Sequence, residues 1–121
     1  MRFTDTEADV IAFLDAREDA PISQTVPSPR PPVFALVWGS GGSGVNRVVD
    51  DVQLTIEGWA EGDADTASAL TLRLRDHLLH EWSQIPYVRR VEATRPYWAP
   101  DPDTKTPRYR FTARLRVRAA R

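Results

Sequence analysis

Two motifs in this sequence have the residue types and spacing of ligand-binding sites. His77 and His80 lie three residues apart in a segment with helical spacing, where two imidazoles can share a metal ion. No motif marks the third protein ligand of a zinc site, so we expect both histidines on the solvent side of a helix. Residues 39–44 satisfy the G-x-G-x-x-G pattern of dinucleotide-binding loops. That site needs a helix directly afterwards, whereas residues from Val45 onward alternate like a strand. We therefore expect neither ligand.

Paired carboxylates are the remaining candidates for catalysis. Asp50 and Asp51 are adjacent in a predicted strand, so they point to opposite faces and do not easily share a proton or a cation. Asp101 and Asp103 lie in a proline-rich turn, and turn formation explains both. No serine has the context of a nucleophile elbow, and the absence of cysteine excludes thiolate chemistry and disulfides. We expect no enzymatic activity and no cofactor.

The strongest pattern lies in the last quarter of the chain. From Arg108 to Arg118 the residues alternate without a slip, which is the period of a half-buried strand. One face carries Tyr109, Phe111, Ala113, Leu115 and Val117. The other, here called the arginine face, carries Thr112 and the five residues Arg108, Arg110, Arg114, Arg116 and Arg118. Aligned like charges repel, so this face needs an acidic neighbour or a polyanion.

Charge is unevenly distributed along the 121 residues. The net charge is −1, but residues 1–65 hold twelve acids and four arginines, a balance of −8, whereas residues 66–121 carry +7. Such a chain can be complementary to copies of itself, and head-to-tail contacts between copies build rings or filaments. The alternative is that both halves fold into one mixed surface.

No stretch is apolar enough for a membrane helix, and acids near the N-terminus exclude a secretory signal, so we expect a cytoplasmic protein.

Apolar periodicity and turn residues predict an α-β-β-α-β-β order. A first helix capped by Thr4 or Thr6 runs to about Asp19, and residues 21–32, with five prolines, form a stiff extended connector. Strands follow over 33–38 and 45–60, then a helix capped by Asp63 or Asp65 that runs to about Trp82. Two further strands are predicted over 87–98 and 108–118. Residues 39–47 form the flexible tip of the first hairpin.

These elements predict one α+β domain over residues 1–121. The sheet is mainly antiparallel, and both helices pack on one of its faces.

The arginine face could also serve a nucleic-acid-binding module. Sheets that bind single strands place stacking aromatics among the basic residues, whereas Tyr109 and Phe111 lie opposite the arginines. The pI near 6.1 also argues against a dedicated nucleic-acid binder, so an acidic protein partner fits better.

The whole pattern resembles the tail terminator proteins of bacteriophages with long, non-contractile tails. The resemblance rests on the order of elements, on the glycine-rich hairpin and on the run from Val49 to Leu54. It continues in Ala67-x-x-Leu70-x-Leu72-Arg73-x-Arg75 and is strongest in Pro102-Asp103-x-x-x-Pro107-Arg108-Tyr109-x-Phe111. The connector over residues 21–32 is longer and richer in proline than is expected of that family.

The resemblance implies a virion protein without enzymatic activity that acts at the head-proximal end of the tail after assembly in the host cytoplasm. Such proteins form a ring, expected here to be a hexamer, which stops polymerisation of the tail tube and joins it to the head-side connector. The partners would be other copies of the chain, the tube protein and the connector. DNA would only pass through, without specific binding. A head-completion or neck protein of the same phages is the nearest alternative.

Ring closure needs two different complementary patches on each subunit. We expect the five arginines of the arginine face to form one patch. The other would be Asp5, Glu7 and Asp9, or Asp50 and Asp51. The hairpin tip, made of Gly39, Ser40, Gly41, Gly42, Ser43 and Gly44, would contact the tube or the connector.

Overall fold

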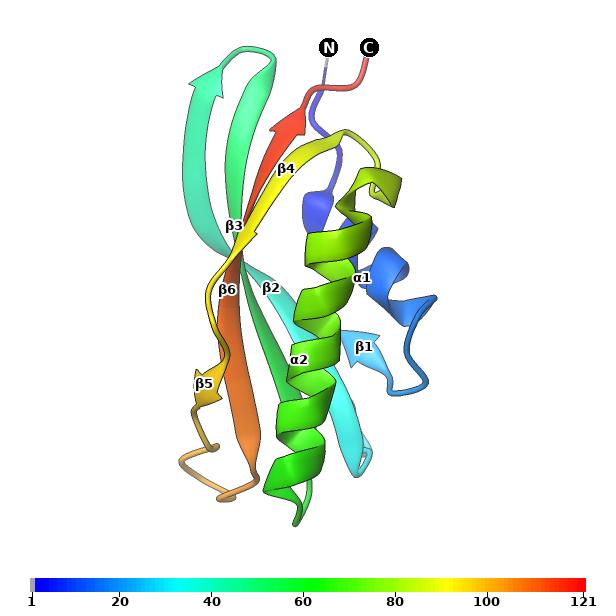
Figure 1. The fold of residues 1–121 in the computed structure, drawn as a ribbon, viewed down its shortest axis with the longest axis vertical. Helices are drawn as coiled ribbons and strands as arrows, with labels where there is room; N and C mark the ends of the chain where they lie inside the picture. Colours follow the sequence, from blue (N-terminus) through cyan, green and yellow to red (C-terminus); the bar gives the residue numbers. More distant parts are fainter. Residues whose placement is uncertain (1) are drawn as a thin grey trace.

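A computed structural model describes residues 2–121 and shows an α+β fold in two layers, a twisted sheet with both helices on one face (Figure 1). The helices are α1 (Thr6–Asp15) and α2 (Ala64–Glu81), the latter followed by a 3₁₀ turn, η1 (Trp82–Gln84). The strands are β1 (Ile22–Ser23), β2 (Val33–Asn46), β3 (Val49–Ala60), β4 (Val88–Ala93), β5 (Tyr97–Trp98) and β6 (Arg108–Arg118). The predicted fold class, with a largely antiparallel sheet, is confirmed.

The sheet has the strand order β1-β2-β3-β6-β4, and β5 pairs with β6 beyond the end of β4. Only the short β1 runs parallel to its neighbour β2; all other pairs are antiparallel. The long strands β3 and β6 form the centre, with Glu57 opposite Arg110 and Asp51 opposite Arg116. The edges are therefore β1 with the far half of β2 on one side, and β4 with β5 on the other.

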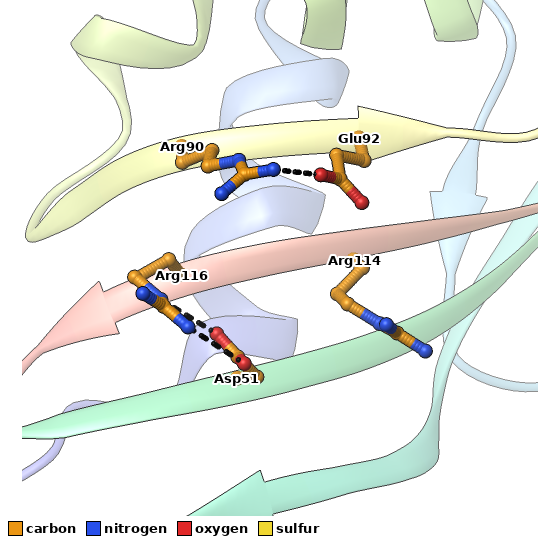
Figure 2. Close-up of a pocket in the computed structure, with 5 residues that line it drawn as sticks. All are labelled: Asp51, Arg90, Glu92, Arg114 and Arg116. Carbon is orange, nitrogen blue, oxygen red and sulfur yellow. Dashed lines mark hydrogen bonds and ion pairs between the residues drawn. The ribbon is translucent and has the colours of Figure 1, made fainter. Parts of the chain in front are cut away.

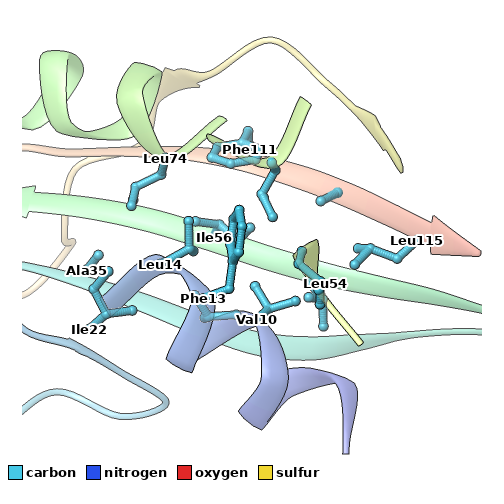
Figure 3. Packing of buried hydrophobic residues seen from close by; sticks show 14 of the residues in the cluster. Val10, Phe13, Leu14, Ile22, Ala35, Leu54, Ile56, Leu74, Phe111 and Leu115 are labelled. Atoms are coloured by element: carbon cyan, nitrogen blue, oxygen red, sulfur yellow. The ribbon is translucent and has the colours of Figure 1, made fainter. Parts of the chain in front are cut away.

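Helical periodicity places the apolar core between the helices and the sheet. Val10, Phe13 and Leu14 of α1, and Leu70, Leu74 and Leu78 of α2, are buried against inward-facing residues of the strands (Figure 3). Both helices begin at an aspartate whose carboxylate accepts backbone N–H groups of the first turn: Asp5 from Ala8 (3.1 Å) and Asp63 from Asp65 and Thr66. The Asp63 cap was predicted as one of two choices, whereas the prediction of a threonine cap for α1 was wrong.

Several predicted boundaries differ from the structure, including those of the strands predicted over 33–38 and 45–60, which span Val33–Asn46 and Val49–Ala60. The first helix ends at Asp15 rather than near Asp19, and the proline-rich connector contributes the two-residue strand β1. The predicted strand over 87–98 is split into β4 and β5, because residues 94–96 leave the ladder between them. The arginine strand keeps its predicted bounds, and all its inward residues are buried except the half-buried Tyr109.

The glycine-rich segment is not a loop. Residues 39–46 continue β2 and pair with β3, with register shifts between Gly39 and Gly41 and between Gly44 and Asn46. The turn itself is only Arg47 and Val48. The prediction of a flexible tip over 39–47 is therefore corrected to an extended hairpin, which reaches beyond the ends of both helices (Figure 1). Glycines carry no side-chain pattern, so the strand was not visible in the sequence.

Gly58 sets how closely α2 approaches the sheet. A Cβ built at Gly58 would overlap the Oγ1 of Thr71 and lie 3.1 Å from the carbonyl oxygen of Ala67. The backbone of β3 therefore touches the helix at this point, and any larger residue must push the two apart.

We expect Gly58→Ala to lower the free energy of unfolding by about 1–3 kcal/mol, because overpacking strains a filled interface. Urea denaturation followed by circular dichroism measures this change. Gly44→Ala is the matched control: a Cβ there meets only Asp50 Oδ1, at an ordinary 3.5 Å, and stability should hardly change. Equal midpoints for Gly58→Ala and the unsubstituted protein would contradict the close-contact argument.

Candidate functional site

The face of the sheet opposite the helices carries the arginine face of β6 and a second buried cluster. Phe34, Leu36 and Trp59 are 1%, 5% and 3% exposed, and the half-buried Trp38 packs against them. The rings of Phe34 and Trp59 stack with centroids 5.0 Å apart. Tyr109 and Phe111 lie opposite the arginines, but β2 and β3 bring two indoles, Trp38 and Trp59, to the arginine side.

Guanidinium groups cover these indoles. Arg108 lies over the Trp59 ring at 4.9 Å and Arg110 over the Trp38 ring at 5.9 Å. Arg30 of the proline-rich connector lies over Trp59 at 5.3 Å and donates to the hydroxyls of Thr104 and Thr106. Cation–π contacts of this kind let charged side chains close an aromatic cluster without a helix above it.

Glu57 is the acidic neighbour that the arginine face needs. Its carboxylate is 1% exposed and accepts from Arg110 (2.7 Å) and from the indole N–H of Trp59 (3.1 Å), with Arg108 Nε at 3.2 Å. Burial alone would lower the pKa of Arg110, but the hydrogen bond and charge of Glu57 outweigh it and raise that pKa. Asp101, 3.8 Å from Arg108, supplies a second negative charge, so two of the five arginines are compensated inside the chain.

The other end of the arginine face forms a shallow depression of about 160 Å³ (Figure 2). Arg116 donates two hydrogen bonds to Asp51, at 2.9 and 3.0 Å, and Arg90 of β4 pairs with Glu92. The bond from Arg116 lowers the pKa of the Asp51 carboxyl below its usual range. Arg114 completes the lining.

Within residues 2–121, neither Arg114 nor Arg118 makes an ion pair. Arg114 is exposed and points into the depression beside Glu92 and Gln53, and Arg118 is half-buried at the end of β6. Of the five arginines predicted to meet another subunit, these two alone have charges that the described chain leaves uncompensated.

The predicted acidic patches are also engaged inside the chain. Asp5 caps α1, Asp9 accepts from Thr4 (2.9 Å), and Asp51 binds Arg116. Glu7 accepts the backbone N–H of Gly39 (2.6 Å) and a bond from the Gln24 side chain. Among the five predicted acids, only Asp50 has no hydrogen bond or ion pair within residues 2–121. The expected contact between Asp51 and an arginine of β6 thus occurs within one chain.

Gly39 lies directly beneath the Glu7 side chain. A Cβ at Gly39 would overlap the Glu7 carboxylate, so a side chain there would displace the contact between α1 and β2. From Gly39 to Gly44 every residue is exposed, and Gly41 and Gly42 have φ of 111° and 127°, values that favour glycine. The segment predicted to meet the tube or connector is therefore an exposed strand held at its base by Glu7.

The histidines lie apart from this surface. His80 is exposed and contacts the carbonyl of Asp76, whereas His77 contacts Glu18 (2.8 Å), which also binds Arg73 (3.1 Å). This cluster joins the end of α1 to α2. Over residues 2–121 no group of three or more potential ligands is arranged to hold a metal ion, and neither helix is long and apolar enough to cross a membrane.

Comparison with protein-family models and with curated proteins finds no match to this chain.

We expect Glu57→Gln to lower the free energy of unfolding by about 3 kcal/mol, because it leaves the half-buried guanidinium of Arg110 without a counter-charge and leaves Arg108 only Asp101, 3.8 Å away. Urea denaturation at neutral pH measures the change. Asp51→Asn is the control from the same strand and face; its pair with Arg116 is more exposed than the pairs of Glu57, and a loss below about 1 kcal/mol is expected. Equal effects of the two substitutions would show that burial does not separate these ion pairs.

The Glu18 cluster predicts a pH dependence. Burial would raise the pKa of Glu18, but the hydrogen bonds from Arg73 and His77 prevail and lower it below 4.5. A lowered pKa contributes stability that is present above 4.5 and is lost as the pH falls through the lowered value. The stability difference between the unsubstituted protein and Glu18→Gln should therefore shrink on acidification below that range. Denaturation across pH measures it, and a constant difference would contradict the prediction.

Proposed function

We propose that this chain is a structural assembly protein that closes the end of a bacteriophage tail tube as a ring and presents a new surface to the head-side connector. The observation that carries the proposal is the unlike character of the two sheet edges. One edge ends in the exposed glycine-rich hairpin of β2 and β3, and the other carries exposed aromatics on β5. A subunit with two different exposed edges can join copies head to tail, and such heterologous contacts close into rings.

The hairpin supports this role because it contributes little to the core of its own chain. Residues 39–46 are all exposed, yet pairing with β3 keeps them extended rather than collapsed on the surface. A strand held in this way can reach a neighbouring subunit or the tube at little cost in conformational entropy. The α+β order agrees with the family resemblance, although fold by itself does not decide function.

Nucleic-acid binding is a second candidate, favoured by one observation, the uncompensated Arg114 and Arg118. Two features oppose it. Asp51 and Glu92 line the same depression as Arg114, and Trp59 is too buried for a base to stack on it. Fluorescence titration with DNA at increasing salt tests this candidate, since phosphate contacts weaken steeply as salt rises. Tight, salt-dependent binding would favour it over the ring.

The direct test of the proposal is deletion of the coding sequence from the genome that carries it, followed by electron microscopy of the particles produced. Without a cap the tube continues to polymerise, so we expect overlong tubes that are not joined to heads. Complementation in trans should restore tails of uniform length. Normal particles, or the absence of any tailed particle from a host that carries the intact gene, would overturn the proposal.

Native mass spectrometry of the purified protein across concentration, at low and moderate salt, gives the oligomeric state. We expect one discrete closed oligomer, a hexamer, that weakens as salt rises, because charged contacts between copies are screened. An open-ended series of sizes would contradict ring closure and indicate filaments.

A further inference from the structure

Strand β5 presents two aromatic side chains at the free edge of the sheet. Tyr97 and Trp98 are 50% and 49% exposed, the largest exposed fractions among the large hydrophobic residues described. Their partners in register are Arg110 and Tyr109, so Tyr97 lies on the arginine side and Trp98 on the helix side. Trp98 contacts Tyr109 edge to face at 5.4 Å, and half of its surface still meets solvent. Tryptophan and tyrosine are the residues most enriched at the energetic centres of interfaces.

Arg95 extends this surface. It is exposed in the break between β4 and β5, and it makes no hydrogen bond or ion pair within residues 2–121. Arg95, Tyr97 and Trp98 together are here called the aromatic edge. Aromatic side chains on the two faces of a short edge strand, beside a guanidinium without a partner in residues 2–121, fit a partner that offers the exposed backbone of another edge strand next to a carboxylate.

The opposite edge of the same sheet offers that surface. Residues 39–46 of β2 include four glycines, have no neighbouring strand on their outer side and carry Val45, which is 47% exposed. Glycines expose the backbone itself, and aromatic rings pack well on strand glycines. Asp50 lies on β3, opposite Gly44 in register, and its half-buried side chain makes no hydrogen bond or ion pair within residues 2–121. Residues 39–46 with Asp50 are here called the glycine edge.

One chain cannot bring these two edges together, because β3 and β6 lie between them in the sheet. Two copies can. We infer that the aromatic edge of one copy docks on the glycine edge of the next, with Tyr97 and Trp98 on the two sides of the glycine strand and Arg95 beside Asp50. The contact is heterologous, so each copy uses both edges, as a closed ring requires. This inference rests on the proposed ring and specifies which surfaces form it.

Engineered disulfides test the contact directly, because the chain has no cysteine of its own. Ser43→Cys marks the glycine edge, and Ala99→Cys marks the aromatic edge without removing any of its side chains. Ala69→Cys, exposed on α2, is the matched control. Mixing the first two variants under mild oxidation should give disulfide dimers at least about tenfold faster than pairing either with the control, because docking raises the local thiol concentration.

Two substitutions test whether the glycine edge and the aromatic edge drive association of the copies. At Gly44 φ is not positive and a Cβ meets no tight contact, so Gly44→Leu should fold normally while covering the docking surface. Trp98→Ala removes the aromatic anchor. Each should raise the concentration needed for assembly at least about tenfold, whereas Ala69→Leu should not.

Charge reversal adds specificity. Asp50→Arg and Arg95→Asp should each weaken assembly, and the two combined in one chain should restore it. Circular dichroism confirms that each variant is folded.

Cross-linking at the control rate, or unchanged assembly of both Gly44→Leu and Trp98→Ala, would overturn the inference. A closed oligomer seen by native mass spectrometry without this cross-link would leave the ring in place and reject only the contact. Conversely, efficient cross-linking together with normal particles after gene deletion would reject the tail function and keep the contact.

Discussion

A carboxylate buried on the side of the sheet without helices organises much of this molecule. Glu57 lies on the central strand β3, and a carboxylate with 1% exposure is tolerated only when it is paired and hydrogen-bonded. Arg108 and Arg110 of β6 provide the counter-charge, and their guanidiniums in turn cover Trp59 and Trp38. A small cluster of aromatic and charged side chains thus closes this end of the face, where a second layer of helices would otherwise be needed.

That arrangement changes the meaning of the arginine face. In the sequence it is a row of five like charges that requires an external acid, but in the fold β3 lies beside β6 and supplies Glu57 and Asp51. The acidic first half and the basic second half of the chain also meet where Glu18 pairs with Arg73. Part of the charge asymmetry is therefore compensated inside one copy, through Glu18, Asp51 and Glu57.

The surfaces left over lie at the edges of the sheet. The far half of β2 and the short β5 are both exposed, and they differ in chemistry, the first rich in glycine and the second aromatic. Natural sheets usually protect such edges with charges, prolines or bulges. Here the register shifts in β2 bend the edge without covering it, and β5 has only two residues. Free edges of this kind suit a protein whose copies associate through the edges of their sheets.

The sequence alone determined the elements in which apolar residues recur with the period of a helix or a strand. These are α2, through its buried leucines, and β6, whose first and last residues were both predicted. The α+β class follows from them. The sequence did not reveal that residues 39–46 form a strand, because glycines leave no pattern and the strand depends on pairing with β3. The partners of the arginines were also hidden, since Glu57 and Asp51 lie 53 and 65 residues away from Arg110 and Arg116. Local periodicity follows from the geometry of one segment, whereas charge pairing and free edges depend on sheet register, which only the tertiary structure decides.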